Sequence, residues 1–412
     1  MVCWYHFHPH LTWHLEAITH DFSDNFFETL FRPDLVYLKS SDPFVSLLFI
    51  SLWFAFLTGF TGWITQEFSW VDRIWSLTPP FYAWLFALHP FLALGEAWPS
   101  SIGGYFFGRP FLLAWLTTLW GVRLTYNFWR KGGYAGGGED YRWAEVRTWF
   151  SHFTLQMFNI FFIAIFQNVL LLLLVMPAHS AWVGRTWQPL TCVDAFLTIF
   201  FLLCLAAETV ADQQQWEFQQ RKRAALAAAA PAAPAAPAAP AAPAAPAAPI
   251  AAATASGTTT PAGSPSRKNR NRNKNKNTNQ NHNHHNPSSP LHRLLPKEIA
   301  DGFCQSGLFA RCRHPNFSAE IALWWVFHIF VYPSAGIHFE RKHDWVNHAY
   351  WPFYINWTII GPVLLTLLFQ GSTDLTEKLS VRKYPRYRQY QMRVPRLWPL
   401  LGDMGKEAVK HE

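Results

Sequence analysis

Charged residues are scarce in this 412-residue chain. Only 15% of the residues are charged, whereas 50% are hydrophobic and 17% aromatic, including 22 tryptophans. This composition excludes an ordinary water-soluble domain and indicates a polytopic membrane protein. Cysteine patterning is absent too: no CxxC pair occurs among the five cysteines, so we expect neither a disulfide framework nor a metal site. They are Cys3, Cys192, Cys204, Cys304 and Cys312.

Acidic residues are missing from residues 221–297, which hold eleven lysines and arginines. The remaining chain has 23 basic and 26 acidic residues, so the net charge of +8 belongs to this insert and not to a nucleic-acid-binding fold. A proline at every third position over 231–249 favours a polyproline II rod, and residues 267–286 lack any aliphatic or aromatic side chain. We expect a disordered, mainly passive linker that touches anionic lipids or proteins and binds no specific nucleic acid.

Seven apolar segments are long enough to span a bilayer, which needs about 20 residues per helix. We therefore predict an all-α polytopic integral membrane protein with about seven transmembrane helices around a cytosol-facing cofactor cavity. The second segment contains Pro79, Pro80 and Pro90 and is expected to be kinked or broken. The segments are 43–64, 74–95, 109–130, 153–177, 189–211, 317–333 and 351–370. The predicted divisions are an N-terminal segment (1–42), membrane parts (43–219 and 298–400), a disordered insert (220–297) and a tail (401–412).

The basic residues of the loops predict the orientation in the membrane. One set of loops holds Arg73, then four basic residues within 130–147, then the insert and the basic C-terminal region. The opposite set holds only four, which are Arg109, Arg185, Arg341 and Lys342. Because basic loops face the cytoplasm, we expect a lumenal N-terminus and a cytosolic C-terminus.

The most informative motif lies at residues 307–320, just before an apolar helix. Arg313, Asn316 and Glu320 are spaced i, i+3, i+7 and share one helix face. Bilayer helices avoid such residues unless they are paired or functional, and this combination suits a phosphate-bearing cofactor. The alternative is an ordinary helix start, with Pro315 in the first turn and interfacial arginines.

Further polar segments also fall on the predicted cytosolic side, at 66–76, 120–142, 208–219 and 374–390. Glu208 and Asp212 stand out because they are spaced i, i+4 near a helix C-terminus, where the helix dipole disfavours carboxylates. The glycines of 132–138 do not form GxGxxG and fit a flexible loop better than a phosphate loop. Capping, snorkelling and interfacial aromatics are the alternative explanations of these segments.

Together these motifs resemble the DUF1295 branch of the steroid 5-alpha-reductase superfamily. The resemblance rests on Val-Asp-Arg-x-Trp at 71–75, the acidic and glutamine-rich segment 208–215, the motif at 307–320 and Tyr-Pro-x-Tyr-x-x-Tyr at 384–390. It covers roughly 43–219 and 298–400 and implies seven membrane helices and an NADPH cavity open to the cytosol. It further implies reduction of a carbon–carbon double bond conjugated to a carbonyl in a small lipophilic, steroid-like substrate. The endoplasmic reticulum is the superfamily's usual membrane.

The resemblance also implies the residues that contact the cofactor. By motif position these are Asp212, Gln219, Asn316 and Glu320, joined by the C-terminal strip Asp374, Glu377, Tyr384 and Arg388. Steroid-reducing members place His and Tyr where Asp374 and Glu377 stand, which puts a steroid substrate in doubt. Gln66-Glu67 resembles the Gln-Glu pair that engages the enone in those members, and Trp120 lies nearest to the tyrosine that works with it.

The predicted reaction needs an acid near the substrate carbonyl to stabilise the developing enolate. The candidates are Glu67 first and Asp72 second, with Tyr126 as a partner, because a desolvated carboxyl can stay protonated. The forked guanidinium groups of four arginines are expected to receive the cofactor phosphates. They are Arg123, Arg130, Arg313 and Arg388.

Two other functions stay open. The Arg-His-Pro stretch at 313–315 and Val394-Pro395 are similar to isoprenylcysteine carboxyl methyltransferases, which use S-adenosylmethionine. Those enzymes are shorter and lack the motifs at 71–75 and 208–215, which favours the reductase. The second alternative is a non-catalytic membrane scaffold that uses the proline-rich and basic insert to bind partners.

Overall fold

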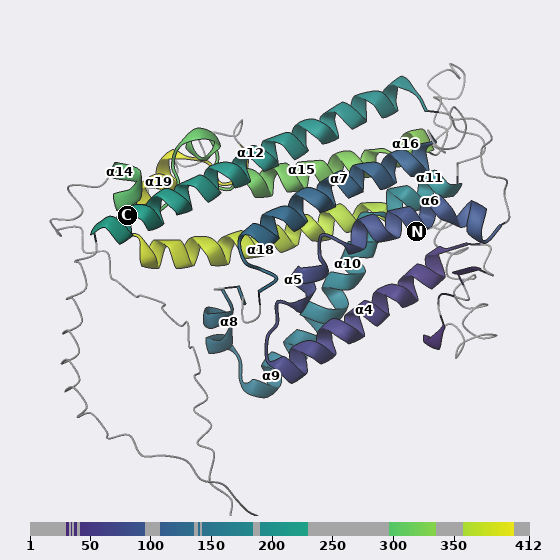
Figure 1. The fold of residues 1–412 in the computed structure, drawn as a ribbon, viewed down its shortest axis with the longest axis horizontal. Coiled ribbons are helices and arrows are strands. Elements are labelled where there is room, and N and C mark those ends of the chain that lie inside the picture. Colours follow the sequence, from purple (N-terminus) through teal and green to yellow (C-terminus); the bar gives the residue numbers. More distant parts are fainter. Residues whose placement is uncertain are drawn as a thin grey trace, which may run out of the picture.

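The computed structural model describes residues 30–32, 34, 37–38, 42–94, 108–135, 139–140, 142–183, 190–229, 296–334 and 357–398. Within these ranges the chain forms helices and no strand (Figure 1). Most of the N-terminal segment, the bulk of the insert and the tail lie outside the described residues. Helix α12 (Cys192–Ala229) continues ten residues past the predicted start of the insert, and α14 (Lys297–Asp301) begins at its end.

Four helices are long and apolar enough to cross a membrane, in keeping with the predicted all-α membrane protein. The first is α4 (Phe44–Thr65), which ends at Gln66 in the left-handed region, φ 58°, with its N–H donating to the Gly62 carbonyl. The second is the continuous run of α9 (His152–Phe158), the π-helical η2 (Asn159–Phe166) and α10 (Gln167–Leu174). The third is α12, and the fourth is η4 (Trp357–Ile359) with α18 (Ile360–Lys383).

Three further helices pack into the same bundle, and they coincide with the other predicted apolar segments. They are α6 (Thr78–Leu92), α7 (Arg109–Arg130) and α15 (Pro315–Ile329). Helix α15 packs closely along α12, and α6 packs along α7. The core between these helices is aromatic and aliphatic, with Trp120, Trp324 and Phe327 fully buried.

The second apolar segment is broken, as the sequence predicts, but the break lies before its prolines, and Pro90 lies inside α6. Pro79 and Pro80 lie in the first turn of α6, where a missing N–H costs nothing. The break falls just before them, between α5 (Trp70–Ile74) and α6. Gly121 of α7 lets the helices approach here, since an added Cβ would lie 2.5 Å from the Ser76 carbonyl oxygen and 2.7 Å from Pro80 Cγ.

Helices α7 and α12 run parallel and are joined by ion pairs at two levels. Arg109 donates to Asp194 through Nε and Nη2, both at 2.7 Å, and the two side chains are 1% and 2% exposed. Fourteen residues further along each helix, Arg123 meets Glu208. Because both helices advance by about 1.5 Å per residue, the two levels are about 21 Å apart and fix one register between α7 and α12.

The remaining elements lie at the two ends of the bundle and in the connections. At one end, the C-terminal ends of α12 and α18 lie beside α14 and α19 (Tyr387–Arg393), at the left of Figure 1. The short helices η3 (Gly307–Ala310) and α8 (Trp143–Trp149) belong to connecting segments, and α11 (Met176–Val183) and α16 (Val331–Ser334) pack together.

Candidate functional site

Arg123 lies at the centre of a carboxylate cluster contributed by three helices. Its Nη2 donates to Glu208 at 2.5 Å and its Nη1 donates to Asp212 at 2.8 Å, both on α12. Glu320 of α15 approaches the same guanidinium at 3.5 Å. All three carboxylates are buried, so one arginine faces three acids inside an apolar bundle. Such a cluster costs folding free energy unless every group is well paired, which makes it a candidate functional site.

Two of these polar atoms have no hydrogen-bond partner within the described part of the chain. They are Arg123 Nε and Glu208 Oε2, and both are buried. Unsatisfied buried groups in a charged cluster are unusual, and each calls for an explanation such as a functional role or a bound water or ion.

Two tryptophans fix the carboxylate of Glu320. Trp120 Nε1 donates to both oxygens, at 3.0 and 2.9 Å, and Trp324 Nε1 donates to Oε1 at 2.8 Å. Both indoles are fully buried and meet edge to face, with ring centroids 4.9 Å apart. The sequence places Trp120 near the catalytic position of the resembled family, and in the structure it contacts the candidate cofactor carboxylate.

The cluster extends toward the end of α7. Asn127 Nδ2 donates to Asp212 at 2.7 Å, and Arg130 donates to Asn127 at 2.9 Å and to Gln213 at 2.7 Å. The Lys131 ammonium lies 3.7 Å from Asp212. Burial lowers the pKa of Lys131 from its ordinary value, although the attraction of Asp212 opposes this effect.

A second polar cluster surrounds Glu377 of α18. Arg313 donates to it at 2.7 and 3.2 Å, His314 Nε2 lies 3.0 Å from it, and Gln391 donates at 2.8 Å. Arg313 also donates to the backbone carbonyls of Gln391 and Val394. This cluster therefore ties the start of α15 to α18 and α19.

The two clusters are close because α15 contributes to both. His314 and Glu320 are six residues apart, which corresponds to about 9 Å along a helix. Four helices, α7, α12, α15 and α18, thus bring Arg123, Asp212, Glu320 and Glu377 into one region, together with Arg313 just before α15, although these residues are spread over 255 positions of the sequence.

A third cluster lies in the loop between α4 and α6. Glu67 accepts from Arg73 at 3.2 Å, and Arg142 donates to Ser372 of α18 at 2.5 Å. Asp72 lies in the electrostatic field of Arg142 and accepts a hydrogen bond from Ser69. Burial, the largest influence, raises the pKa of Asp72 above that of an ordinary aspartate, while Arg142 and Ser69 lower it. Arg142 thus links this loop to α18, five residues before Glu377.

Other predicted site residues lie apart from these contacts. Tyr384 accepts from Lys222 at 3.2 Å, and Asp374 pairs with Arg396 at 2.7 Å. Arg388 is exposed. Within the described part of the chain, no hydrogen bond joins Gln219, Asn316 or Arg388 to another side chain, so these three are available to a ligand.

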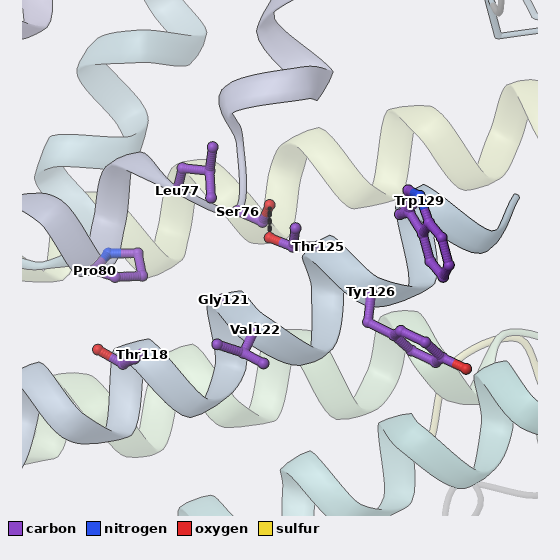
Figure 2. Close-up of a pocket in the computed structure, with 9 residues that line it drawn as sticks. All are labelled: Ser76, Leu77, Pro80, Thr118, Gly121, Val122, Thr125, Tyr126 and Trp129. Carbon is purple, nitrogen blue, oxygen red and sulfur yellow. Dashed lines mark hydrogen bonds between the residues drawn. The ribbon is translucent and has the colours of Figure 1, made fainter. Parts of the chain in front are cut away.

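Tyr126 lines a groove of about 460 Å³ between α6 and α7, which is separate from the clusters (Figure 2). This position does not test its expected role as a partner of the acid.

The sequence alone does not show which residues pair with the candidate site residues. Arg109–Asp194 is buried although both residues flank loops. The signal was the equal spacing of 109 to 123 and 194 to 208, which becomes meaningful only when the two helices are known to run parallel. His314, the histidine of the Arg-His-Pro stretch, is also buried and is a hydrogen-bond partner of Glu377.

Comparisons with known proteins identify relatives without a described activity. The model of the DUF1295 family, a family of unknown function, matches residues 60–394. An uncharacterized protein of Schizosaccharomyces pombe is 31% identical over 371 residues, which are 90% of this chain and 83% of that protein. No solved structure matches the chain.

Proposed function

Since the chain belongs to the DUF1295 family, whose function is unknown, we propose a function from the geometry of its own residues. The protein is a membrane-embedded reductase that uses NADPH to reduce a carbon–carbon double bond conjugated to a carbonyl in a lipophilic substrate. The main support is the cluster of Arg123, Glu208, Asp212 and Glu320, because buried ionisable groups in a membrane bundle are functional far more often than structural.

The proposal extends to the fold and the membrane. It places the chain in the steroid 5-alpha-reductase superfamily, with α6, α7 and α15 as spans beside the four long apolar helices. The register between α7 and α12 supports this, because it holds α7 at the depth of the apolar half of α12. We propose the endoplasmic reticulum as the membrane, with a lumenal N-terminus and the polar clusters at the cytosolic end.

The donor set of the clusters fits a dinucleotide phosphate. Carboxylates such as Asp212 and Glu320 accept hydrogen bonds from ribose hydroxyls and amides, and guanidinium groups bind phosphates through two parallel hydrogen bonds. Asn316, one turn before Glu320, has a free side-chain amide within the described region. Arg123 and Arg313 are held by carboxylates, so binding a phosphate exchanges one anionic partner for another. The Nε–H of Arg123, which has no acceptor within the described residues, is the donor best placed to bind a phosphate oxygen.

NADPH supplies the hydride, and the protein supplies orientation and a proton. Of the two carboxyl candidates we choose Asp72. Glu67 lies 3.2 Å from Arg73, whereas burial raises the pKa of Asp72 above that of an ordinary aspartate. A protonated Asp72 donates a hydrogen bond to the substrate carbonyl and stabilises the enolate that forms on hydride transfer.

The cofactor is tested with the full-length protein purified in detergent. NADPH, NADH and S-adenosylmethionine are added separately, and the melting temperature is measured, because a ligand that binds the folded state raises it. The proposal predicts stabilisation by NADPH above that by NADH. Stabilisation by S-adenosylmethionine alone refutes the reductase in favour of a methyltransferase, and no response to any of the three refutes a cofactor site and favours a scaffold.

A further inference from the structure

A groove lies on the outer face of α7, and none of its lining residues belongs to the polar clusters. It lies between the start of α6 and the second half of α7 and has a volume of about 460 Å³ (Figure 2). This volume is within the range of small-molecule pockets, about 300–1,000 Å³. The lining residues are Ser76, Leu77, Pro80, Thr118, Gly121, Val122, Thr125, Tyr126 and Trp129.

The groove faces away from Arg123. Thr118, Val122, Thr125 and Trp129 follow one another at i, i+4, i+7 and i+11 and therefore share a face of α7. Arg123, which points toward α12, lies on the opposite side of the helix, about 140° around the axis from Thr118 at 100° per residue. The groove is therefore not an entrance to the carboxylate cluster.

The Ser76, Thr118 and Thr125 hydroxyl groups in the groove are already hydrogen-bonded within the protein. Ser76 and Thr125 bond to each other at 2.7 Å, as Figure 2 shows. Thr118 accepts from Trp84 at 2.9 Å and donates to the Ala114 carbonyl at 2.7 Å. Apart from the polar tips of Tyr126 and Trp129, the surface that remains is hydrocarbon, which suits an alkyl chain and offers little to a sugar or a nucleotide.

The chemistry of α7 changes at the end of the groove. Tyr126 and Trp129 are more than half exposed, and the Arg130 guanidinium carbon lies 5.5 Å from the Tyr126 ring centroid. The next residue, Lys131, faces Asp212 of α12 instead, with its ammonium 3.7 Å from that carboxylate. Aromatic residues followed by basic residues at the end of an apolar helix mark the level of the lipid headgroups. The register with α12 places the opposite end of the groove, near Thr118, within the apolar depth of the bundle.

We propose that this groove binds one acyl chain of an anionic glycerophospholipid, with the phosphate near Arg130. The apolar lining matches the chain, and Arg130, beside the Tyr126 ring and hydrogen-bonded within the described residues only to the neutral Asn127 and Gln213, provides charge complementarity to the headgroup. Arg130 is also a cofactor candidate, but the lining residues of the groove belong to none of the polar clusters, and the test does not depend on a cofactor.

Photo-cross-linking tests the proposal with the unaltered protein. The full chain is placed in nanodiscs with phosphatidylserine or phosphatidylcholine carrying a diazirine in one acyl chain, and adducts are mapped by mass spectrometry. We expect adducts concentrated on 118–129 and about fivefold more of them with phosphatidylserine, the preference expected from one basic residue near the surface. Adducts spread equally over the exposed face of α12 overturn the site, and equal labelling by the two lipids overturns the headgroup assignment.

A matched pair of variants provides the second test. Val122→Trp fills the groove, whereas Leu119→Trp adds the same side chain at an exposed position of α7 outside it. We expect loss of groove adducts in Val122→Trp and unchanged adducts in Leu119→Trp. Equal adduct yields in both variants contradict the proposal. Both positions are exposed, so neither substitution overpacks the core.

Discussion

Arg123 of α7 donates to Glu208 of α12 fourteen residues beyond the point where Arg109 donates to Asp194 on the same two helices. The Arg109–Asp194 pair, called the outer pair below, is bidentate, and Asp194 also accepts from the Thr191 N–H at 2.7 Å. At the other level, the single guanidinium of Arg123 faces three carboxylates. The same register therefore produces a structural pair at one end and a polar site at the other.

Removing Arg123 leaves three buried carboxylates without their shared cation. We expect Arg123→Gln to destabilise the protein by about 3–5 kcal/mol, the usual cost of breaking a buried ion pair from one side. Thermal unfolding in detergent measures this loss. Glu217→Gln on the exposed side of α12 is the control and is expected to unfold like the wild type. An Arg123→Gln variant as stable as the control contradicts the assigned pairing.

The outer ion pair is predicted to matter for stability alone. Asp194→Asn leaves Arg109 buried and uncompensated, so the melting temperature falls. Because the pair is about 21 Å from Arg123, NADPH affinity measured below the melting temperature is expected to stay at the wild-type value. A large loss of affinity in the folded Asp194→Asn protein argues against two separate levels.

The close approach of α6 and α7 at Gly121 allows a direct test of packing. Gly121→Ala places a Cβ 2.5 Å from the Ser76 carbonyl oxygen and should cost about 1–3 kcal/mol. Gly371→Ala in α18 meets nothing within 4 Å and is expected to stabilise the helix by up to about 1 kcal/mol. Comparing the unfolding of the two variants checks the helix contact, and equal stability of both is incompatible with it.

If Asp72 is the proton donor, the reduction rate depends on pH in a defined direction. The raised pKa of Asp72 means that its folded carboxyl holds a proton more tightly than the unfolded chain does. Both the reduction rate and the contribution of Asp72 to stability therefore fall as pH rises from the ordinary aspartate value, about 3.9, through the folded pKa. Rate–pH profiles of the wild type and Asp72→Asn measure this. The variant should lose most of its activity and the corresponding limb of the profile, and a profile equal to the wild type assigns the proton to another group.

Which parts of the fold could be predicted from the sequence depends on whether they arise from local or long-range interactions. Apolar length and composition predicted the positions of α4 and α7 closely and the start of α12, because the bilayer imposes them locally, but α12 runs eighteen residues past the predicted end at 211. The prolines of the second segment were expected to kink or break it. The segment is broken between α5 and α6, Pro79 and Pro80 begin α6, since the first turn has no use for their missing N–H, and Pro90 lies inside α6.

The contacts of the site were not predictable in the same way. The i, i+3, i+7 spacing predicted one helix face for Arg313, Asn316 and Glu320, but α15 begins at Pro315, so Arg313 precedes the helix. Glu320 lies on α15 and is bound by Trp120, two hundred residues away. Likewise, nothing local to Glu377 indicates that Arg313 and His314 are its partners. Such pairings follow from the packing of α15 between α12 and α18, which a single sequence does not specify.

The most direct measurement is the NADPH dissociation constant of the purified protein and of Glu320→Gln, with Asn316→Ala as a second site variant and Glu217→Gln as the control. Glu320→Gln keeps the size of the side chain and one oxygen that accepts from Trp120 and Trp324, while it removes the charge and the second acceptor oxygen. Loss of one charge-assisted hydrogen bond predicts NADPH binding that is weaker by about tenfold to a hundredfold in each site variant, and unchanged in the control. NADPH affinity that is equal in all four proteins, or absent from the wild type, contradicts a cofactor site at this cluster.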